Sequence, residues 1–415
     1  MRAVDLAPVD PADQTQRPAD LFLIFVGANI VATTLQVGAS LPSSLGPSAA
    51  AGVIAAGALG GAALTAALAP TGSRLRVPSI VAARAVLGHG GAALLALLLF
   101  LTNFAWIALN NAIAASITVR MAGGPPAWWA VELGVAATLI VLGGPRTAAL
   151  VDRVAVPLLL ASGVVFTVAC IRTPMPAWPV EAPPASDLVR GLDIVAGYQV
   201  SWLLMFADYP RFVRSGRAAG VAVFLGLALT ALWFMPLGYV AAAVAGSSDP
   251  GAMVTAVGLG WWGALLVAVA ALTTNFVNIY MSALAFKSLR PSVSGSTAVW
   301  IVGGVGAALG FLSSGWLDQF AAFTLILAGG LVPIGGILLA HYLVLAPPVN
   351  LDALYTTSGP GRALRGISAP GAIAWTCGAA MFAAAGDIGA SLPALVTSLV
   401  AYVLVFKWQA RRART

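Results

Sequence analysis

Apolar segments of membrane-spanning length follow one another almost without interruption from Leu21 to Trp408. A helix needs about 20 apolar residues to cross the hydrocarbon core of a bilayer. Hydrophobic residues make up 60% of the chain and charged residues only 8%, more apolar surface than a soluble domain of 415 residues can bury. The pattern therefore predicts an all-α, polytopic membrane protein with one domain and about twelve transmembrane helices. The predicted spans are 21–41, 47–69, 91–119, 126–143, 147–171, 188–207, 218–246, 260–286, 297–314, 318–343, 369–386 and 390–408.

Basic residues lie mostly in alternate gaps between these spans. If the N-terminus is cytoplasmic, the outer loops keep only Arg120, Arg172 and Arg190 of the 21 basic residues. This asymmetry follows the positive-inside rule, so both termini are predicted to be cytoplasmic. The net charge of +7 is explained by the same anchoring. A basic patch interleaved with aromatic residues, as nucleic-acid binding would need, is absent from the sequence.

The sequence lacks the usual signatures of enzymes and of structural metal sites. Its two histidines have no ligand-like spacing, and both cysteines fall inside apolar spans. Nucleophile-elbow, zinc-protease and phosphate-loop motifs are missing. We therefore expect no enzymatic activity and no cofactor other than a coupling ion.

The polar and apolar stretches predict one transport core with short cytoplasmic additions. Residues 1–20 form an N-terminal tail that is too polar for a cleavable signal peptide. Residues 21–343 hold the first ten spans, and 344–368 form a Pro- and Gly-containing cytoplasmic loop. Residues 369–408 are predicted to form two peripheral helices, and residues 409–415 are predicted to form a basic cytoplasmic tail. We expect the chain to act as a monomer in the cytoplasmic (inner) membrane of a bacterium.

Polar residues gather inside four of the predicted spans, although a polar group in a span is costly. Ordinary helix packing explains any one of these groups. Together they indicate a binding site, because the first and sixth spans open two successive groups of five. That arrangement suits an inverted repeat with a midplane site where the first helix of each half is interrupted. The groups are Gly27, Asn29, Thr33, Thr34 and Gln36 in the first span, Thr102, Asn103, Trp106, Asn110 and Asn111 in the third, Gly197, Tyr198, Gln199, Ser201 and Trp202 in the sixth, and Thr273, Thr274, Asn275, Asn278, Tyr280 and Ser282 in the eighth.

Five stretches carry a resemblance to a known family. They are the loop 72–88 with its Ala-Arg pair, Asn103-x-x-Trp106, the sequence A-D-Y-P-R-F at 207–212, T-T-N at 273–275 and V-P-I-G-G at 332–336. In this order and at these spacings they resemble the nucleobase–cation symporters, or purine/pyrimidine permeases. The likeness is greatest to the bacterial cytosine-permease and hydroxymethylpyrimidine-transporter branch.

The resemblance implies a leucine-transporter-type fold, with ten spans in two inverted groups of five plus two peripheral helices. It also implies a solute site between spans one, three, six and eight. A flat heterocycle needs an aromatic face for stacking, which Trp106 offers, and an amide to read its edge. Whether Tyr198 or Trp202 faces the pocket is left open. The candidate substrate-binding residues are Gly27, Asn29, Asn103, Trp106, Tyr198, Gln199, Ser201, Trp202 and Asn275.

The same resemblance implies a coupling cation, sodium, held by oxygen atoms alone. The implied ligands are the Thr273 and Thr274 hydroxyls and the carbonyls of Gly27, Ile30 and Ala270. No acidic residue lies in this group, which suits sodium better than a carboxylate proton relay. The alternative is that both threonines simply bond their own helix.

Four charged residues lie near the ends of predicted spans, where they could act in gating, ion pairing or proton transfer. Asp208 and Arg211 are predicted to form an inner gate or ion pair at the cytoplasmic end of the sixth span. Asp193, at its outer end, is either a gate or an interfacial residue. Glu132 in the fourth span either reaches the outer interface, where it pairs with Arg120, or handles a proton.

Two departures from the cytosine branch leave the substrate open. Gln199 stands where that branch has an aromatic residue, and Ala270 where it has an asparagine. The sequence thus predicts a secondary transporter that imports a nucleobase or related heterocycle, such as cytosine or hydroxymethylpyrimidine, with a cation, by alternating access. The first alternative is a proton-coupled carrier of another small polar solute. A channel-like or receptor-like protein is the less favoured alternative.

Overall fold

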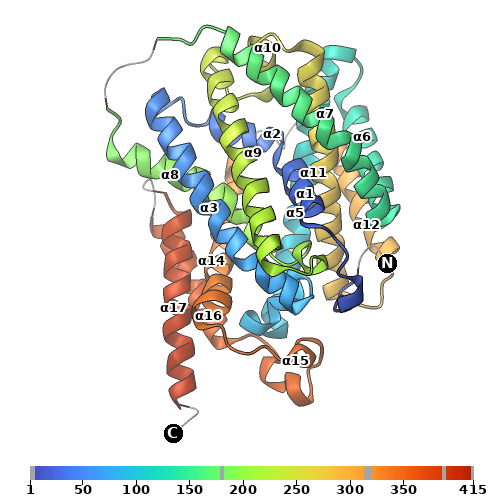
Figure 1. Ribbon diagram of the computed structural model, residues 1–415, viewed down its shortest axis with the longest axis vertical. Helices are drawn as coiled ribbons and strands as arrows, with labels where there is room; N and C mark the ends of the chain where they lie inside the picture. The colour runs from blue at the N-terminus through green and yellow to red at the C-terminus, as the bar shows by residue number, and fades with distance from the viewer. Residues whose placement is uncertain (1–4, 178–181, 313–319, 386–388, 413–415) are drawn as a thin grey trace.

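The computed structural model describes residues 5–177, 182–312, 320–385 and 389–412, which are mostly helical and contain no β-strand (Figure 1). Over its described residues, each predicted span coincides with a helix, or with two in the case of the first span, and some are extended by a 3-10 or π-helical turn. Residues 313–314, 318–319 and 386 of the predicted spans lie outside the described residues. The long helices are α1 (Pro18–Asn29), α2 (Ala32–Ala39), α3 (Pro47–Leu75), α5 (Arg84–Ala122), α6 (Pro126–Leu142), α7 (Gly144–Arg172), α8 (Ala185–Val200), α9 (Gly216–Ala245), α11 (Gly260–Leu289), α12 (Gly295–Ala308), α14 (Phe320–Leu339), α16 (Ala369–Ala384) and α17 (Ser391–Arg412). The short elements are η1 (Pro11–Asp13), α4 (Ser79–Ala82), η2 (Ser201–Met205), η3 (Pro210–Phe212), α10 (Pro250–Ala256), η4 (Leu309–Leu312), the π-helix η5 (Ala340–Leu345), α15 (Leu351–Tyr355) and η6 (Gly359–Leu364).

The helices have the lengths that a multi-pass membrane protein requires. Within the described ranges, eight helices are long and apolar enough to cross a bilayer, and α1 with α2 makes a ninth as a pair bent by 58°. The apolar helices α6 and α12 are shorter, and α8 continues into η2. Figure 1 shows α10 at one end of the molecule and α15 with the C-terminus at the other. The connection that holds α10, predicted to be outside, and the loop that holds α15, predicted to be inside, therefore lie at opposite ends.

The first span is interrupted within its length, as predicted. Helix α1 ends at Asn29, Val31 has an extended backbone (φ −139°, ψ 162°), and α2 begins at Ala32. The last ladder bond of α1 runs from the Ile30 N–H to the Val26 carbonyl, at 3.0 Å. The carbonyls of the last turn of α1 are thereby left for other partners.

The sixth span is helical at Gly197, a residue type that permits a helix to unwind. Gly197 lies inside α8, and the helix only tightens into η2 after Val200. The glycine serves close packing instead, because a Cβ at this position would lie 2.8 Å from Ser391 Oγ on α17.

Two groups of helices pack as separate bodies. We call α1, α2, α3, α8 and α9 the first-span body, and α5, α6, α11 and α12 the third-span body. Contacts between α1 and α11 join the two bodies near the interrupted span. Helices α16 and α17 pack on each other and on α14.

Within the first-span body, α2 and α9 cross at two glycines that face each other's main chain. A Cβ on Gly38 would overlap the backbone of Met235, and one on Gly238 would overlap the backbone of Leu35. We expect Gly238→Ala to lower the free energy of unfolding by about 1–3 kcal/mol, the usual cost of overpacking. Thermal unfolding in detergent measures this loss. Gly60→Ala, where a Cβ meets nothing within 4 Å, is the matched control and should unfold like the parent. Equal unfolding temperatures for both variants would contradict the close crossing.

Asp193, at the outer end of the sixth span, caps α17 with its buried carboxylate. It accepts hydrogen bonds from the N–H groups of Ala390 (3.0 Å), Ser391 (3.0 Å) and Leu392 (2.7 Å). An anion at a helix N-terminus satisfies the first N–H groups and complements the helix dipole. Asp193 therefore fastens α17 to the sixth span.

Candidate functional site

The interrupted first span lies against the eighth span, and the predicted cation ligands meet there. The Thr273 hydroxyl donates to the Gly27 carbonyl of α1 at 3.3 Å and to the Ala270 carbonyl of its own helix at 3.0 Å. The Thr274 hydroxyl donates to the Ala270 carbonyl at 2.9 Å. Ile30 is fully buried at the end of α1. The group thus bridges the first-span body and the third-span body.

The chemistry of these donors is uniform. All are neutral oxygens, and the described residues hold no group of three or more His, Cys, Asp or Glu side chains that could bind a metal ion. Neutral carbonyl and hydroxyl oxygens suit a hard cation. Both threonines also bond their own helix, so the alternative role expected from the sequence is present as well.

Two tryptophans pack on apolar clusters that include residues next to the interruption. Trp106 of α5 packs on the cluster that contains Ala32, the first residue of α2. Trp202 of η2 packs on the cluster that contains Ala28, near the end of α1. Both rings are half-buried, and Trp202 Nε1 is buried with no hydrogen-bond partner. Trp202 therefore lies at the interface of the first and eighth spans.

Tyr198 lies elsewhere on the same span. Its hydroxyl is within 2.8 Å of the Thr34 hydroxyl and 3.2 Å of the Thr33 hydroxyl, both on α2. Ser201 is exposed, and its hydroxyl donates to the Tyr198 carbonyl at 2.6 Å. Tyr198 thus holds the second half of the first span against the sixth span.

Two of the predicted edge-reading amides are turned toward the seventh span. Asn29 Nδ2 donates to the Leu227 carbonyl at 3.2 Å and to the Thr230 hydroxyl at 2.6 Å. Gln199 Nε2 approaches the same Leu227 carbonyl at 3.4 Å. Both side chains are fully buried. These contacts were not foreseen, since Thr230 is a lone polar residue in the seventh span and a carbonyl leaves no mark in the sequence.

The remaining amides differ in whether they have partners. Asn103 is 8% exposed, and its Nδ2 has no hydrogen-bond partner. It precedes Trp106 by three residues, so the two side chains share one face of α5. Asn275 instead donates to Asn111 Oδ1 at 2.7 Å and accepts from Asn110 Nδ2 at 3.3 Å. Asn275 therefore fastens α11 to α5.

The predicted ion pair between Asp208 and Arg211 is wrong, because the structure records no contact within 4.0 Å between their charged groups. Asp208 Oδ1 accepts from the Ser79 N–H at 3.3 Å, and its Oδ2 is buried without a partner. Arg211 donates to the Asp5 carbonyl from two nitrogens, each at 3.2 Å, and to the Tyr280 hydroxyl at 3.0 Å. Burial raises the pKa of the Asp208 carboxyl, although Ser79 and Arg211 act to lower it.

Comparisons with known proteins agree with this arrangement. A family model described as permease for cytosine/purines, uracil, thiamine and allantoin matches residues 8–404. A purine-cytosine permease candidate of Bacillus subtilis, YxlA, is 27% identical over 232 residues, which are 53% of this chain and 49% of that protein. The cytosine permease of Escherichia coli strain K12 is 26% identical over 292 residues, 66% of this chain and 65% of that protein. The matched part of the chain thus spans between half and two thirds of these relatives.

Solved structures show the fold. The nucleobase-cation-symport-1 family transporter Mhp1, in a closed conformation with bromovinylhydantoin bound, matches with a TM-score of 0.81 at 20% identity, over 98% of this chain and 95% of that one. Its inward-facing conformation matches with a TM-score of 0.77 at 20% identity, over 99% of this chain and 95% of that one. These matches confirm the predicted leucine-transporter-type fold, and the relatives are permeases and transporters, not enzymes. With its family model covering nearly the whole chain, this protein belongs to the permeases for cytosine/purines, uracil, thiamine and allantoin, the nucleobase–cation symporter family.

Proposed function

We propose that the chain is a secondary transporter that imports a nucleobase or related heterocycle together with a cation by alternating access. The observation that carries this proposal is the interrupted first span, flanked by Trp106 and Trp202 and bonded to Thr273 across the two bodies. A site between two bodies can open to either side when they move relative to each other. Counterflow of labelled cytosine in proteoliposomes loaded with unlabelled cytosine tests the proposal, with related heterocycles as further substrates. Efflux without counterflow would indicate a channel instead.

The substrate class follows from donors and rings at the interruption. Asn103 Nδ2 and Trp202 Nε1 are buried N–H donors without partners, which is costly unless a ligand supplies acceptors. Heterocyclic bases carry acceptors on their rim and a flat face that stacks on an indole. The names of the relatives, a cytosine permease and a transporter with a hydantoin bound, support the same class.

For the cation we propose sodium, held by the Gly27, Ile30 and Ala270 carbonyls and by the Thr273 and Thr274 hydroxyls. Four of these five residues supply atoms that already contact one another. A bound cation there would hold α1 against α11, since its ligands come from both bodies. The ion would thereby favour the arrangement in which the neighbouring substrate position is complete, which is how two ligands become coupled.

A second candidate, proton coupling, is favoured by one observation. Asp208 is 1% exposed, has a carboxylate oxygen without a partner, and has its pKa raised by burial. Such a carboxyl keeps its proton to a higher pH than an exposed aspartate. Glu132, the other acidic candidate, is on the exposed face of α6, and the side chain of its proposed partner Arg120 lies outside the described residues.

The two coupling modes predict different pH profiles. If Asp208 carries the coupling proton, uptake falls as pH rises through its raised pKa, and Asp208→Asn abolishes concentrative uptake. If sodium is the coupling ion, we expect Asp208→Asn to keep concentrative uptake driven by a sodium gradient. Uptake into proteoliposomes, measured from pH 5 to 9 with and without sodium, distinguishes them. If uptake does not depend on sodium and is lost in Asp208→Asn, the coupling ion is the proton and not sodium.

We further propose that the chain works as a monomer in a bacterial inner membrane with both termini cytoplasmic. In this arrangement residues 21–343 form the transport core, 344–368 an inner loop and 369–408 a flanking helix pair. Single cysteines near Arg74 and Arg214 should react with impermeant reagents only from the inside, and one near Asp249 only from the outside. The opposite pattern would reverse the topology.

A further inference from the structure

The segment before the first span is laid across the cytoplasmic end of the molecule. We call residues 5–17 the N-terminal strap. The Val9 N–H donates to the Arg76 carbonyl at 2.9 Å, and the Gln16 N–H to the Phe212 carbonyl at 3.1 Å. Gln14 Nε2 lies 2.9 Å from the Ser73 carbonyl. These acceptors are at the inner end of α3 and in η3, which follows the sixth span, so this part of the strap belongs to the first-span body.

The beginning of the strap reaches the other body. The Tyr355 hydroxyl donates to the Leu6 carbonyl at 2.6 Å. Tyr355 ends α15, which Arg84 ties to the start of α5 by donating to the Leu354 carbonyl at 2.8 Å. Arg84 also donates to the Ser288 hydroxyl of α11 at 3.2 Å.

Apolar packing supports this second attachment. The Leu6 side chain is half-buried and packs on a core cluster built mainly from α5, α6, α11 and α12. It also packs on a second cluster, which includes the start of α5 and α14 as well as residues of α3, α8 and η2. Leu6 therefore gives the strap an apolar attachment to the third-span body.

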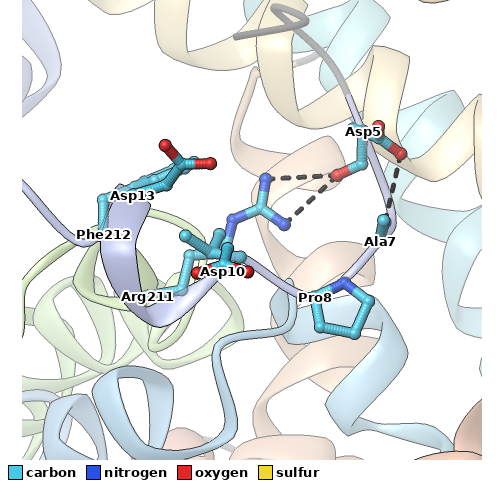
Figure 2. Close-up of a pocket in the computed structure, with 8 residues that line it drawn as sticks. Asp5, Ala7, Pro8, Asp10, Asp13, Arg211 and Phe212 are labelled. Carbon is cyan, nitrogen blue, oxygen red and sulfur yellow. Dashed lines mark hydrogen bonds between the residues drawn. The ribbon is translucent and has the colours of Figure 1, made fainter.

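Arg211, in η3, connects the strap to both bodies. Arg211 is 2% exposed, and its guanidinium donates to the Asp5 carbonyl (Figure 2). It also donates to the Tyr280 hydroxyl of α11. Figure 2 shows Asp5, Ala7 and Pro8 following one another along one side of this guanidinium. A cavity of about 180 Å³ lies between the strap and the turn that carries Arg211 and Phe212.

A series of aromatic rings leads from the interrupted span to this point. Trp202 contacts Phe25 at a centroid distance of 5.9 Å, Phe25 contacts Tyr209 at 6.4 Å, and Tyr209 contacts Tyr280 at 5.6 Å. The last ring is the one whose hydroxyl accepts from Arg211. The path from the proposed substrate site to the inner face is thus filled by rings and covered at its end by the strap.

We infer that the N-terminal strap is an inner latch, which must release for the two bodies to separate on the cytoplasmic side. This inference rests on the proposed function, because separation of the bodies is what alternating access requires. Residues 9–16 stay with the first-span body, whereas the Leu6 and Tyr355 contacts hold the strap to the third-span body. Inward opening therefore breaks these contacts and the bond from Arg211 to Tyr280.

Cysteine labelling tests the latch without requiring transport. The reporter is Ala28→Cys, buried among Met205, Val277 and Met281, in a background with both native cysteines replaced by alanine. We expect a membrane-impermeant maleimide, added from the cytoplasmic side, to label it about tenfold faster when residues 2–8 are deleted. Leu6→Gly with Tyr355→Phe should have the same effect at full length, and carries the test if the deletion does not reach the membrane. Thr15→Ala, an exposed strap residue, should leave the rate unchanged.

A reversible cross-link supplies the complementary test. Leu6→Cys with Tyr355→Cys, joined by a bifunctional methanethiosulfonate, should lose at least about nine tenths of cytosine uptake, and dithiothreitol should restore it. The matched control, Val9→Cys with Arg76→Cys, joins two residues of one body and should transport normally when cross-linked.

The outcomes separate the latch from the proposed function. Unchanged labelling in both strap variants, or full uptake with the Leu6–Tyr355 cross-link in place, would overturn the latch while leaving transport established. Faster labelling in a protein that carries no heterocycle would support the latch as a device that closes the inner face, and would overturn the proposed function.

Discussion

Replacing Trp106 by alanine is expected to remove most heterocycle uptake while the protein stays in the membrane at the parent level. Stacking of a base on an aromatic side chain is worth about 1–3 kcal/mol, which is about 5- to 150-fold in affinity. Trp106 offers such a face, since its ring packs on the cluster that contains Ala32 of the first span, and it shares a helix face with Asn103, whose amide nitrogen has no partner among the described residues. Binding of labelled cytosine to purified protein, together with uptake into proteoliposomes, measures the loss.

The matched control for Trp106→Ala is Trp128→Ala. Trp128 is 63% exposed on α6 and suits an interfacial position, so its loss should leave binding unchanged. Asn103→Ala should change which heterocycles compete with cytosine, because the amide reads the rim and not the face of the ring. Normal affinity in Trp106→Ala would make this tryptophan a packing residue and move the substrate elsewhere.

Sequence patterns predicted the features that depend on hydropathy and on element order. Apolar runs located the long helices of the described residues, because a bilayer imposes the length of a span. The interruption of the first span followed from polar and small residues near Gly27, and the structure places it three residues later, at Ile30 and Val31. Gly197 is also a small residue within a span, but its lack of a side chain lets Ser391 of α17 pack closely against it. A glycine in a span does not by itself distinguish a break from a close contact.

Partners of polar side chains were harder to predict, because many of them are main-chain atoms. Asn29 and Gln199 bond the Leu227 carbonyl, and Arg211 bonds the Asp5 carbonyl instead of the Asp208 carboxylate. Carbonyls occur at every residue, so only the fold shows which of them are free. The packing of the strap could not be predicted for a related reason. A polar, Pro-rich tail resembles solvated chain, and the carbonyls that accept its hydrogen bonds are known only from the fold.

Among the cation ligands, Thr274 gives a cleaner test than Thr273. The Thr273 hydroxyl bonds both its own helix and the Gly27 carbonyl, so its loss would also loosen the contact between the two bodies. The Thr274 hydroxyl bonds only the Ala270 carbonyl of its own helix. Thr274→Val keeps the branched shape and removes a single oxygen, so a change in ion dependence can be assigned to that oxygen.

Thr274→Val is expected to raise the sodium concentration for half-maximal cytosine binding by about tenfold, the effect of losing one favourable contact worth 1–2 kcal/mol. Linkage requires cytosine affinity at fixed low sodium to fall as well, and saturating sodium to restore most of it. Thr102→Val is the matched control, because the buried Thr102 hydroxyl donates to the Leu99 carbonyl of its own helix at 3.2 Å without belonging to the proposed ion site. Sodium titrations of cytosine binding to the purified proteins decide the matter. If Thr274→Val and Thr102→Val respond to sodium alike, the oxygen of Thr274 holds no ion, and Asp208 becomes the first residue to examine for proton coupling.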